Sequence, residues 1–450
     1  MVEKNQIREN LIKRYEAKHA GSRAYYEKAC SCLPGADTRS AAYFAPFPFV
    51  TEKAQGCRMV DIDGNEYYDF LNNYTSLAHG HAFAPVVKAV QEQAEKGTAF
   101  ATNLELQYNL AKLLCGRVSC LDEIRFANSA SEAMMFAMRA ARAFTGKDGF
   151  LTINGGYSGS TDFLQANYPP DLEHGKSPQP KAGRGISGSI VKDIYVAPFN
   201  DLNRMEEILK QNNEKIAAIL MEPMMGSSGC IMPEPGYLEG VRRLADKYEV
   251  LLIFDETITL RFSEGGLGEI YGVKPDLLVT GKTIGGGLPV GAFGGAKVIM
   301  EQFNPAQEDC ISHTGTFNGN SITMAAGLAA MQYFTQTEID RINGLGDRMK
   351  KGILDIFSSL NINGCVQGFG SILQINHHSL VSAKNAEEFY ISEKLDGLLC
   401  SCIHLSMVTK GVFFAPRGMI VLSTAMNEQV IDEALYAFRE AYEEIRSLLP

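Results

Sequence analysis

The sequence predicts an α/β protein in which helices cover a mostly parallel sheet. Short apolar runs, such as 216–221 and 251–254, have the length and composition of buried strands. Longer stretches, such as 131–145 and 236–248, have the pattern of helices. Because strand and helix patterns alternate along the chain, a mostly parallel sheet covered by helices is expected.

The N-terminal part is expected to contain a helical segment and a β-hairpin. Residues 1–30 have a helical pattern on a charged background, and Pro34-Gly35 ends it. Residues 60–70 have the pattern of two strands joined by a turn at Asp63-Gly64.

The middle of the chain carries most of the predicted strands and helices. Residues 170–190 are rich in Pro, Gly, Ser and Lys and are expected to form an exposed loop. The expected strands are 123–126, 150–153, 216–221, 251–254 and 277–280, and the expected helices are 85–96, 104–117, 131–145, 202–211 and 236–248.

The C-terminal part predicts a smaller α+β domain. A long helix is expected from about Ser321, followed by helices mixed with short strands at 372–375, 412–414 and 420–423. The chain is therefore expected to divide into an N-terminal segment (1–75) that packs with the small domain, a large domain (76–320) and a small C-terminal domain (321–450).

The composition argues against several kinds of partner. The chain has 450 residues, of which 45% are hydrophobic, enough for a large core. Its net charge of −10 provides no attraction to nucleic acid or to anionic membranes. No apolar run reaches the roughly 18 residues of a transmembrane helix, and the first residues lack a signal-peptide pattern. Ten cysteines without regular spacing favour a reduced, cytoplasmic protein.

Three of the expected strands end in ionisable residues, Glu222, Asp255 and Lys282. Ligands of open α/β sheets collect beyond the carboxyl ends of the strands, so these residues are expected to share a site. A lysine that loses its proton can form a Schiff base, and an acid can keep the pyridine nitrogen of pyridoxal phosphate (PLP) protonated. The alternative is an ordinary solvated lysine before a flexible turn.

Two further segments fit a PLP site. Ser129-Ala130-Ser131 follows a predicted strand and precedes a predicted helix, so its backbone N–H groups can bind a phosphate. Tyr157 lies in a glycine-rich turn and could stack on a flat ring. Alone, each segment would be an ordinary helix cap or turn.

In this order, these residues resemble class III aminotransferases, which belong to the fold-type I PLP-dependent enzymes. The resemblance covers about residues 30–430 and implies a large domain with a mostly parallel seven-stranded sheet and a smaller α+β domain. The motifs that carry it are Phe254-Asp255-Glu256, Gly281-Lys282-Thr283-Ile284-Gly285-Gly286-Gly287-Leu288-Pro289 and His313-Thr314-Gly315-Thr316-Phe317-Asn318-Gly319-Asn320.

The resemblance implies a role for each candidate residue. Lys282 would form the Schiff base, and Asp255 would pair with the pyridine nitrogen. Thr316 would complete the phosphate site of the neighbouring subunit, which implies a homodimer. Tyr157 would stack on the ring. The residues that hold the phosphate would be Ser129, Ala130 and Ser131, and Glu222 and Ser227 would lie beside the cofactor.

Two branches of the family are similar to different parts of the chain. Residues 285–295 are most like glutamate-1-semialdehyde aminomutase. Residues 35–40 and 415–419 resemble β-amino-acid aminotransferases that act on β-phenylalanine, as does the position of Arg261. The chain departs from the usual family pattern at Ala130, Ser131, Ser158 and Thr257, but no central group is lost.

Arg39 and Arg417 are the candidate substrate residues. Both lie in apolar surroundings, and the guanidinium group suits carboxylate recognition. The resemblance implies that Arg39 takes the carboxylate of a β-amino acid and that Arg417 helps with a second carboxylate; structural ion pairs are the alternative. Tyr43 would line a side-chain pocket or simply pack, and Arg261 is expected to be structural.

The predicted activity is ping-pong transamination from a β-amino acid, aromatic or aliphatic, to a 2-oxo acid such as 2-oxoglutarate or pyruvate. The alternatives are an aminomutase, a racemase or epimerase, and a non-catalytic PLP-binding protein. No metal site is expected, since His79-Gly80-His81 has no further ligands nearby.

Overall fold

The computed structural model describes residues 2–175, 177–377, 379 and 381–449. Its largest element is a seven-stranded sheet with strand order β4-β10-β9-β8-β7-β5-β6. Only β10 runs antiparallel to its neighbours, which confirms the predicted mostly parallel sheet. The strands are β4 (Glu123–Ala127), β5 (Gly149–Ile153), β6 (Ile194–Ala197), β7 (Ile216–Met221), β8 (Leu251–Asp255), β9 (Leu277–Gly281) and β10 (Gly291–Gly295).

Helices cover both faces of this sheet because alternate side chains of each strand point to opposite faces. Leu220 of β7 packs on the face covered by α6 (Ala130–Thr145), whereas Ile219 packs on the other face. That second face is covered by α8 (Leu202–Asn212) and α9 (Tyr237–Lys247) towards β6, and by α5 (Glu105–Arg117) and α12 (Ser321–Tyr333) towards β4.

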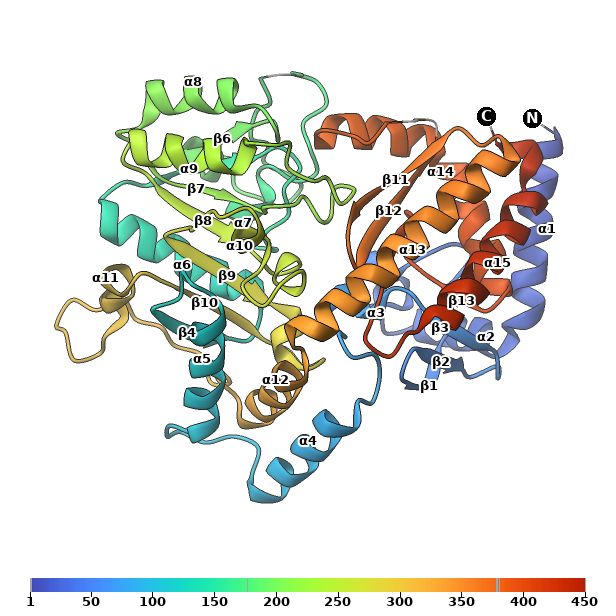
Figure 1. Cartoon of the computed structure of the whole chain (residues 1–450), viewed down its shortest axis with the longest axis horizontal. Coiled ribbons are helices and arrows are strands. Elements are labelled where there is room, and N and C mark those ends of the chain that lie inside the picture. The colour runs from blue at the N-terminus through green and yellow to red at the C-terminus, as the bar shows by residue number, and fades with distance from the viewer. Residues whose placement is uncertain (1, 176, 378, 380, 450) are drawn as a thin grey trace.

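Further helices belong to this half of the molecule, on the left in Figure 1, or lie between the two halves. The predicted loop at 170–190 contains no regular strand or helix among its described residues before Ile190. The helices are α3 (Asn72–Thr75), α4 (Ala84–Lys96), α7 (Asp162–Gln165), α10 (Leu267–Ile270) and α11 (Lys297–Met300).

The other half combines both ends of the chain (Figure 1). The predicted N-terminal helical segment is two helices, α1 (Val2–Lys18) and α2 (Ala20–Ala29), and the three long C-terminal helices are α13 (Gln336–Leu360), α14 (Ala386–Thr409) and α15 (Glu428–Glu444). The strands are β1 (Thr51–Gln55), β2 (Arg58–Asp61), β3 (Glu66–Asp69), β11 (Gly364–Phe369), β12 (Ile372–His377), β13 (Val412–Phe413) and β14 (Met419–Val421).

The two chain ends share one core and one sheet. The predicted hairpin forms from β2 and β3, and the C-terminal strand β13 joins it in parallel. Tyr15 of α1 packs in the same cluster as Phe438 of α15, and Arg14 forms an ion pair with Glu444 at 2.6 Å. These contacts support the proposed packing of the N-terminal segment with the small domain.

Helix α12 lies at the proposed boundary between the two domains. Its Met324 and Met331 pack with residues of α5 and the large sheet. The division of the chain into domains stays a proposal, and these contacts favour a second boundary just after α12, near residue 334, rather than at 320.

Candidate active site

The predicted site residues meet at one edge of the large sheet. Strands β4, β5, β7, β8 and β9 all end at this edge, because β10 reverses direction between β4 and β9. A cavity of about 380 Å³ opens there. Seven of the predicted residues line it: Ser129, Ala130, Ser131, Tyr157, Glu222, Asp255 and Lys282.

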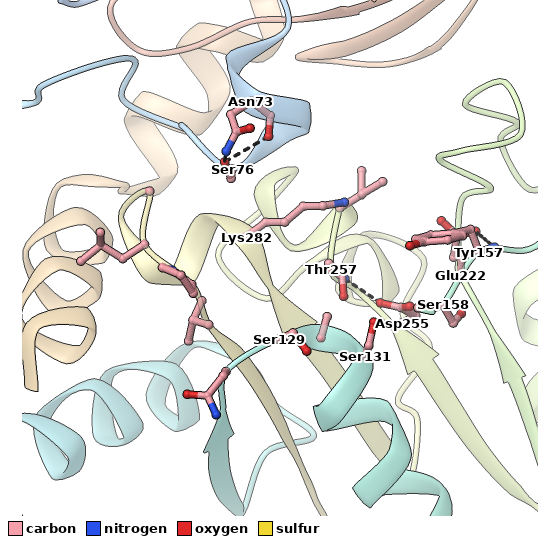
Figure 2. A pocket seen from close by; sticks show the side chains of 18 residues that line it. Asn73, Ser76, Ser129, Ser131, Tyr157, Ser158, Glu222, Asp255, Thr257 and Lys282 are labelled. Carbon is pink, nitrogen blue, oxygen red and sulfur yellow. Dashed lines mark hydrogen bonds between the residues drawn. The ribbon is translucent and has the colours of Figure 1, made fainter. Parts of the chain in front are cut away.

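Lys282 reaches into the cavity from the end of β9, towards the side where Tyr157 lies (Figure 2). Its backbone has a φ of 48°, a left-handed conformation that costs a lysine about 1–2 kcal/mol. Burial lowers the pKa of the Lys282 amine, whereas the carboxyl groups of Asp255 and Glu222 raise it. A buried amine with a lowered pKa is more easily deprotonated and more nucleophilic.

Asp255 ends β8 and is 4% exposed. Its Oδ1 accepts a hydrogen bond from the backbone N–H of Thr257 at 3.0 Å. Burial raises the pKa of Asp255, while Thr257, Lys282 and Ser158 lower it. The carboxyl group is therefore held in place at the base of the cavity, where it can pair with a cationic ring nitrogen.

Glu222 connects two walls of the site. Its Oε1 accepts from the backbone N–H of Tyr157 at 2.9 Å, and its Oε2 accepts from that of Gly226 at 3.0 Å. Burial and the nearby charge of Asp255 raise the pKa of Glu222 to about 8. Tyr157 is 37% exposed, and its ring lies edge-on to that of Tyr168 at 5.2 Å between centroids.

The start of α6 forms one wall of the cavity, which Ser129, Ala130 and Ser131 line. Ser129 caps the helix, and its Oγ accepts from Glu132 N–H at 3.2 Å. The backbone N–H groups of Ala130 and Ser131, in the first turn, have no intrahelical acceptors. Gly291 of β10 brings the sheet close to this turn, since a Cβ there would lie 2.0 Å from the Ser129 carbonyl oxygen.

These residues fit PLP. The cavity combines amide donors at a helix N-terminus for a phosphate, a buried carboxyl group for a ring nitrogen and a lysine amine for an aldehyde. The turn that carries the amide donors occupies the space that a side chain at position 291 would take. This close packing against Gly291 holds the donors in place.

Five predicted residues lie outside the cavity lining. Arg39 is exposed, and its Nη1 donates to Oδ1 of Asn73, a lining residue, at 2.8 Å. Arg417 is also exposed, and its Nη2 donates weakly to the carbonyl of Ser227 at 3.5 Å. Tyr43 is 45% exposed and lines a separate cavity of about 460 Å³ that Arg417 also borders.

Thr316 is exposed on the surface. Its segment is anchored by Asn318, whose Oδ1 accepts from Asn128 Nδ2 at 3.0 Å and whose Nδ2 lies 3.1 Å from His313 Nε2. Because Asn128 lines the cavity, the anchor lies next to the site while Thr316 faces outward.

Asn73 and Ser76 were not predicted as site residues, although both line the cavity (Figure 2). Asn73 lies in α3 and Ser76 directly follows this helix, in which all four residues, Asn72–Thr75, have positive φ angles. Asparagine tolerates this conformation best, so Asn72-Asn73 was a signal of an unusual turn in the sequence. That this turn reaches the site depends on the tertiary fold.

The two histidines near this turn, His79 and His81, make polar contacts with other parts of the protein. The ring nitrogens of His79 contact Thr424 Oγ1 at 2.8 Å and the Ala330 carbonyl at 2.9 Å, and His81 pairs with Asp69 at 2.7 Å. Both ring nitrogens of His79 and Nε2 of His81 are therefore engaged by protein groups.

The fold and site define a PLP-dependent enzyme of fold type I. More narrowly, the chain belongs to the class III aminotransferase family, whose sequence model matches residues 40–442. PLP is its cofactor. No described helix is both long enough and apolar enough to cross a membrane.

Relatives from both branches are similar to the chain. Glutamate-1-semialdehyde 2,1-aminomutase of Methanocaldococcus jannaschii is 35% identical over 94% of this chain and 98% of the relative. An omega-transaminase from Sphaerobacter thermophilus is 36% identical with a TM-score of 0.90, covering 94% and 98% of the two chains. A β-phenylalanine aminotransferase from Variovorax paradoxus is 30% identical with a TM-score of 0.90, covering 99% of each chain.

Proposed function

We propose that this enzyme is an aminotransferase that moves the amino group of a β-amino acid to a 2-oxo acid such as 2-oxoglutarate or pyruvate. The observation that carries this proposal is the presence of two arginines beside the cavity: Arg39 donates to the lining residue Asn73, and Arg417 donates to the carbonyl of Ser227. The Arg39 guanidinium carbon lies 5.7 Å from the Tyr74 ring centroid. Burial raises the pKa of Tyr74, and the charges of Arg417 and Arg39 both lower it.

Two guanidinium groups at one rim suit a reaction with two carboxylate substrates. The amino donor and the oxo-acid acceptor of a ping-pong reaction occupy the same cavity in turn. Arg39 contacts the lining residue Asn73, whereas Arg417 approaches Ser227, next to the loop that Glu222 holds. We therefore assign the β-amino carboxylate to Arg39 and a second carboxylate to Arg417.

Aromatic side chains at the same rim support an aromatic donor. The Tyr157 ring contacts Tyr168, and the hydroxyl of Tyr390 interacts with Tyr168 and with Arg417. The Tyr157 ring lines the cavity and provides an apolar face for an aryl group. A β-amino acid such as β-phenylalanine has both chemical features.

The residues of the chain supply positioning and proton transfer. When bound, PLP withdraws electrons from the substrate carbon that bears the amino group, which makes its proton acidic. Lys282 Nζ accepts that proton as a general base and later returns it as a general acid. Asp255 holds the ring nitrogen, and the α6 turn with Ser129 holds the phosphate.

The second candidate is glutamate-1-semialdehyde aminomutase activity. The relative from M. jannaschii bears this name and is 35% identical over nearly the whole chain. An aminomutase acts on one substrate and needs no separate acceptor. Both activities use the same lysine and acid, so the cavity geometry around Lys282 is compatible with either.

A substrate panel separates the two activities. The purified enzyme is incubated with α-, β- and ω-amino donors, with 2-oxoglutarate or pyruvate, and separately with glutamate-1-semialdehyde alone. We expect a new amino acid only when a β-amino donor and an oxo acid are both present. Conversion of glutamate-1-semialdehyde without an acceptor, and no reaction of β-amino donors, would refute the proposal.

We further propose that the active form is a cytoplasmic homodimer in which Thr316 completes the neighbouring phosphate site. Thr316 is exposed, yet its segment is anchored through Asn318 to the cavity residue Asn128. A threonine that faces outward from the rim of one site can reach a second copy of the chain. The partners are thus small-molecule substrates and another subunit.

A further inference from the structure

Arg261 is a fully buried arginine in the short 3-10 helix Thr259–Arg261, which follows Asp255. Its Nε donates to Ser371 Oγ at 3.1 Å, its Nη1 to the Thr75 carbonyl at 3.4 Å and its Nη2 to the Leu422 carbonyl. All three partners are neutral. Within the described part of the chain, no carboxylate lies at ion-pair distance from this guanidinium.

An unpaired buried cation needs an explanation. Removing a charge from water costs several kcal/mol unless an opposite charge or hydrogen bonds compensate. Burial lowers the pKa of Arg261 to about 9, with no opposing charge. An uncharged side chain could connect the same segments at a lower desolvation cost. The positive charge of Arg261 therefore indicates a role beyond packing.

Arg261 lies against the turn that carries Lys282. The Thr75 carbonyl oxygen accepts from Arg261 Nη1 at 3.4 Å and also from Thr283 Oγ1 at 3.4 Å. Thr283 directly follows Lys282 in the 3-10 helix Lys282–Gly285. A single carbonyl group therefore connects the guanidinium with the residue next to the reactive lysine.

The charged groups that face Lys282 oppose one another. Asp255 at the end of β8 and Glu222 after β7 favour the protonated amine, while burial and the charge of Arg261 favour the neutral amine. A like charge destabilises a nearby cation, which is one way in which enzymes activate a lysine. Arg261 is a cation that acts on Lys282 in this way, with a smaller effect than burial, Asp255 or Glu222.

We propose that Arg261 is a positioning residue whose positive charge, with no carboxylate at ion-pair distance, counteracts Asp255 and Glu222 and thereby favours the neutral, nucleophilic form of the Lys282 amine. The inference rests on the proposed role of Lys282 and is independent of the substrate. Through Thr75, the same side chain also fixes the turn that presents Lys282.

The test measures how readily Lys282 reacts at different pH values. The full-length protein, freed of cofactor, is treated with an amine-specific reagent, and modified Lys282 is quantified by peptide mass spectrometry. The visible absorbance of the PLP-loaded enzyme is titrated in parallel. Arg261→Gln and Arg261→Met remove the charge, Arg261→Lys keeps it, and Ser371→Ala removes one hydrogen-bond partner only.

We expect the charge-removing variants to shift the labelling midpoint upward by about one pH unit, which makes Lys282 roughly tenfold less reactive near neutral pH. Arg261→Lys and Ser371→Ala should keep the wild-type midpoint. Arg117→Gln is the control, because Arg117 also donates to a backbone carbonyl, that of Phe334, but is paired with Glu264 and is not among the charges that act on Lys282.

A wild-type midpoint in both charge-removing variants would overturn the proposal, as would an equal shift in Ser371→Ala. Two charge-removing variants are used so that the misfolding of one does not decide the outcome. Apolar replacements of buried ions are often tolerated. Borohydride reduction of the PLP-loaded enzyme, followed by peptide mapping, distinguishes the two levels of failure. Cofactor attached elsewhere than Lys282 refutes the proposed site itself, whereas attachment to Lys282 with an unchanged midpoint refutes only the role of Arg261.

Discussion

At the scale of single residues, the site is a balance of charges around Lys282. Asp255 and Glu222 stabilise its protonated form, and burial and Arg261 destabilise that form. The amine needs its proton at one stage of transamination and must be free of it at another. A lysine whose pKa is displaced from its ordinary range by opposing neighbours can serve both stages.

Replacing Lys282 with alanine should abolish covalent attachment of PLP and turnover, because no other amine replaces Lys282 Nζ. The measurement is the visible absorbance of the purified variant together with donor consumption. Lys297→Ala, which removes an exposed lysine of α11, should leave both unchanged. Full activity in Lys282→Ala would contradict the proposed chemistry.

The raised pKa of Glu222 predicts that the free energy of unfolding depends on pH. Its pKa is raised from 4.5 to about 8, so folding takes up a proton between these values. The stabilisation it provides is complete below about pH 4.5 and is lost as the pH rises through 8. The cofactor-free protein should therefore lose stability relative to Glu222→Gln, by roughly 1.4 kcal/mol per pH unit at most. Urea unfolding between pH 5 and 8 measures this difference, and parallel curves for the two proteins would disprove it.

Arg39 should affect one substrate more than the other. Arg39→Ala should raise the KM of a β-amino donor about tenfold or more, because a charged hydrogen bond contributes about 1.5–3 kcal/mol. The KM of the oxo acid should change less. Arg23→Ala, which breaks exposed ion pairs of α2 with Glu16 and Glu27, is the control. Equal changes for donor and acceptor would argue against the assignment.

At the scale of elements, the contact between β10 and the start of α6 fixes the phosphate end of the site. Gly291 has room for no side chain, since an added Cβ would meet the Ser129 carbonyl. The turn with the free N–H groups is therefore pressed against a strand. Its donors do not need to be ordered when a phosphate binds, which reduces the entropic cost of binding.

Gly291→Ala should lower the free energy of unfolding by about 1–3 kcal/mol and weaken PLP binding, since β10 and the Ser129 turn must separate. Gly344→Ala is the matched control, because an added Cβ in the middle of α13 meets nothing within 4 Å. That variant should gain about 0.5–1 kcal/mol from its helix propensity. Denaturant titration and cofactor titration would measure both effects; tight PLP binding in Gly291→Ala would contradict the argument.

Strands with strong apolar runs could be predicted, whereas weaker ones could not. Strands β7, β8 and β9 consist almost entirely of buried apolar residues and match the predictions closely. Strand β10 has the sequence Gly-Ala-Phe-Gly-Gly, which has low strand propensity, although the strand pairs with both β4 and β9. Strand β1 is mostly exposed, so it lacks the pattern of a buried strand.

At the scale of the whole molecule, the proposed dimer makes Thr316 part of a site in the neighbouring subunit. Thr316→Val should weaken PLP binding about tenfold or more through loss of a hydrogen bond to a charged group. Thr314→Val, an exposed change in the same segment, should not. Cofactor titration of the purified variants measures the difference.

Mixed dimers provide a sharper test. A dimer of Lys282→Ala and Thr316→Val subunits contains one site with both changes and one with neither, if Thr316 acts across the interface. Mixing the inactive or weakened variants should therefore restore activity. If Thr316 served its own subunit, every site would contain one defect and mixing would restore nothing.

The sequence predicted residues at strand ends better than residues that meet through folding. Glu222, Asp255 and Lys282 could be predicted because the carboxyl ends of parallel strands share one edge. The contacts of Arg39 with Asn73 and of Arg417 with Ser227 join positions far apart in the chain, so no local pattern encodes them. The contact of Arg261 with Thr75 could not be predicted for the same reason. It is apparent only in the folded structure, where Arg261 is buried without a carboxylate at ion-pair distance.

The left-handed turn Asn72–Thr75 has a consequence for engineering the enzyme's substrate range. Asn73 lines the cavity and has a φ of 48°, which glycine and asparagine adopt at low cost and β-branched residues only at a higher cost. A mutant library at this position should therefore yield folded enzymes mainly with glycine, asparagine or aspartate. Ser76 has an ordinary backbone conformation, so it is the position in this wall where a wide range of side chains can be introduced.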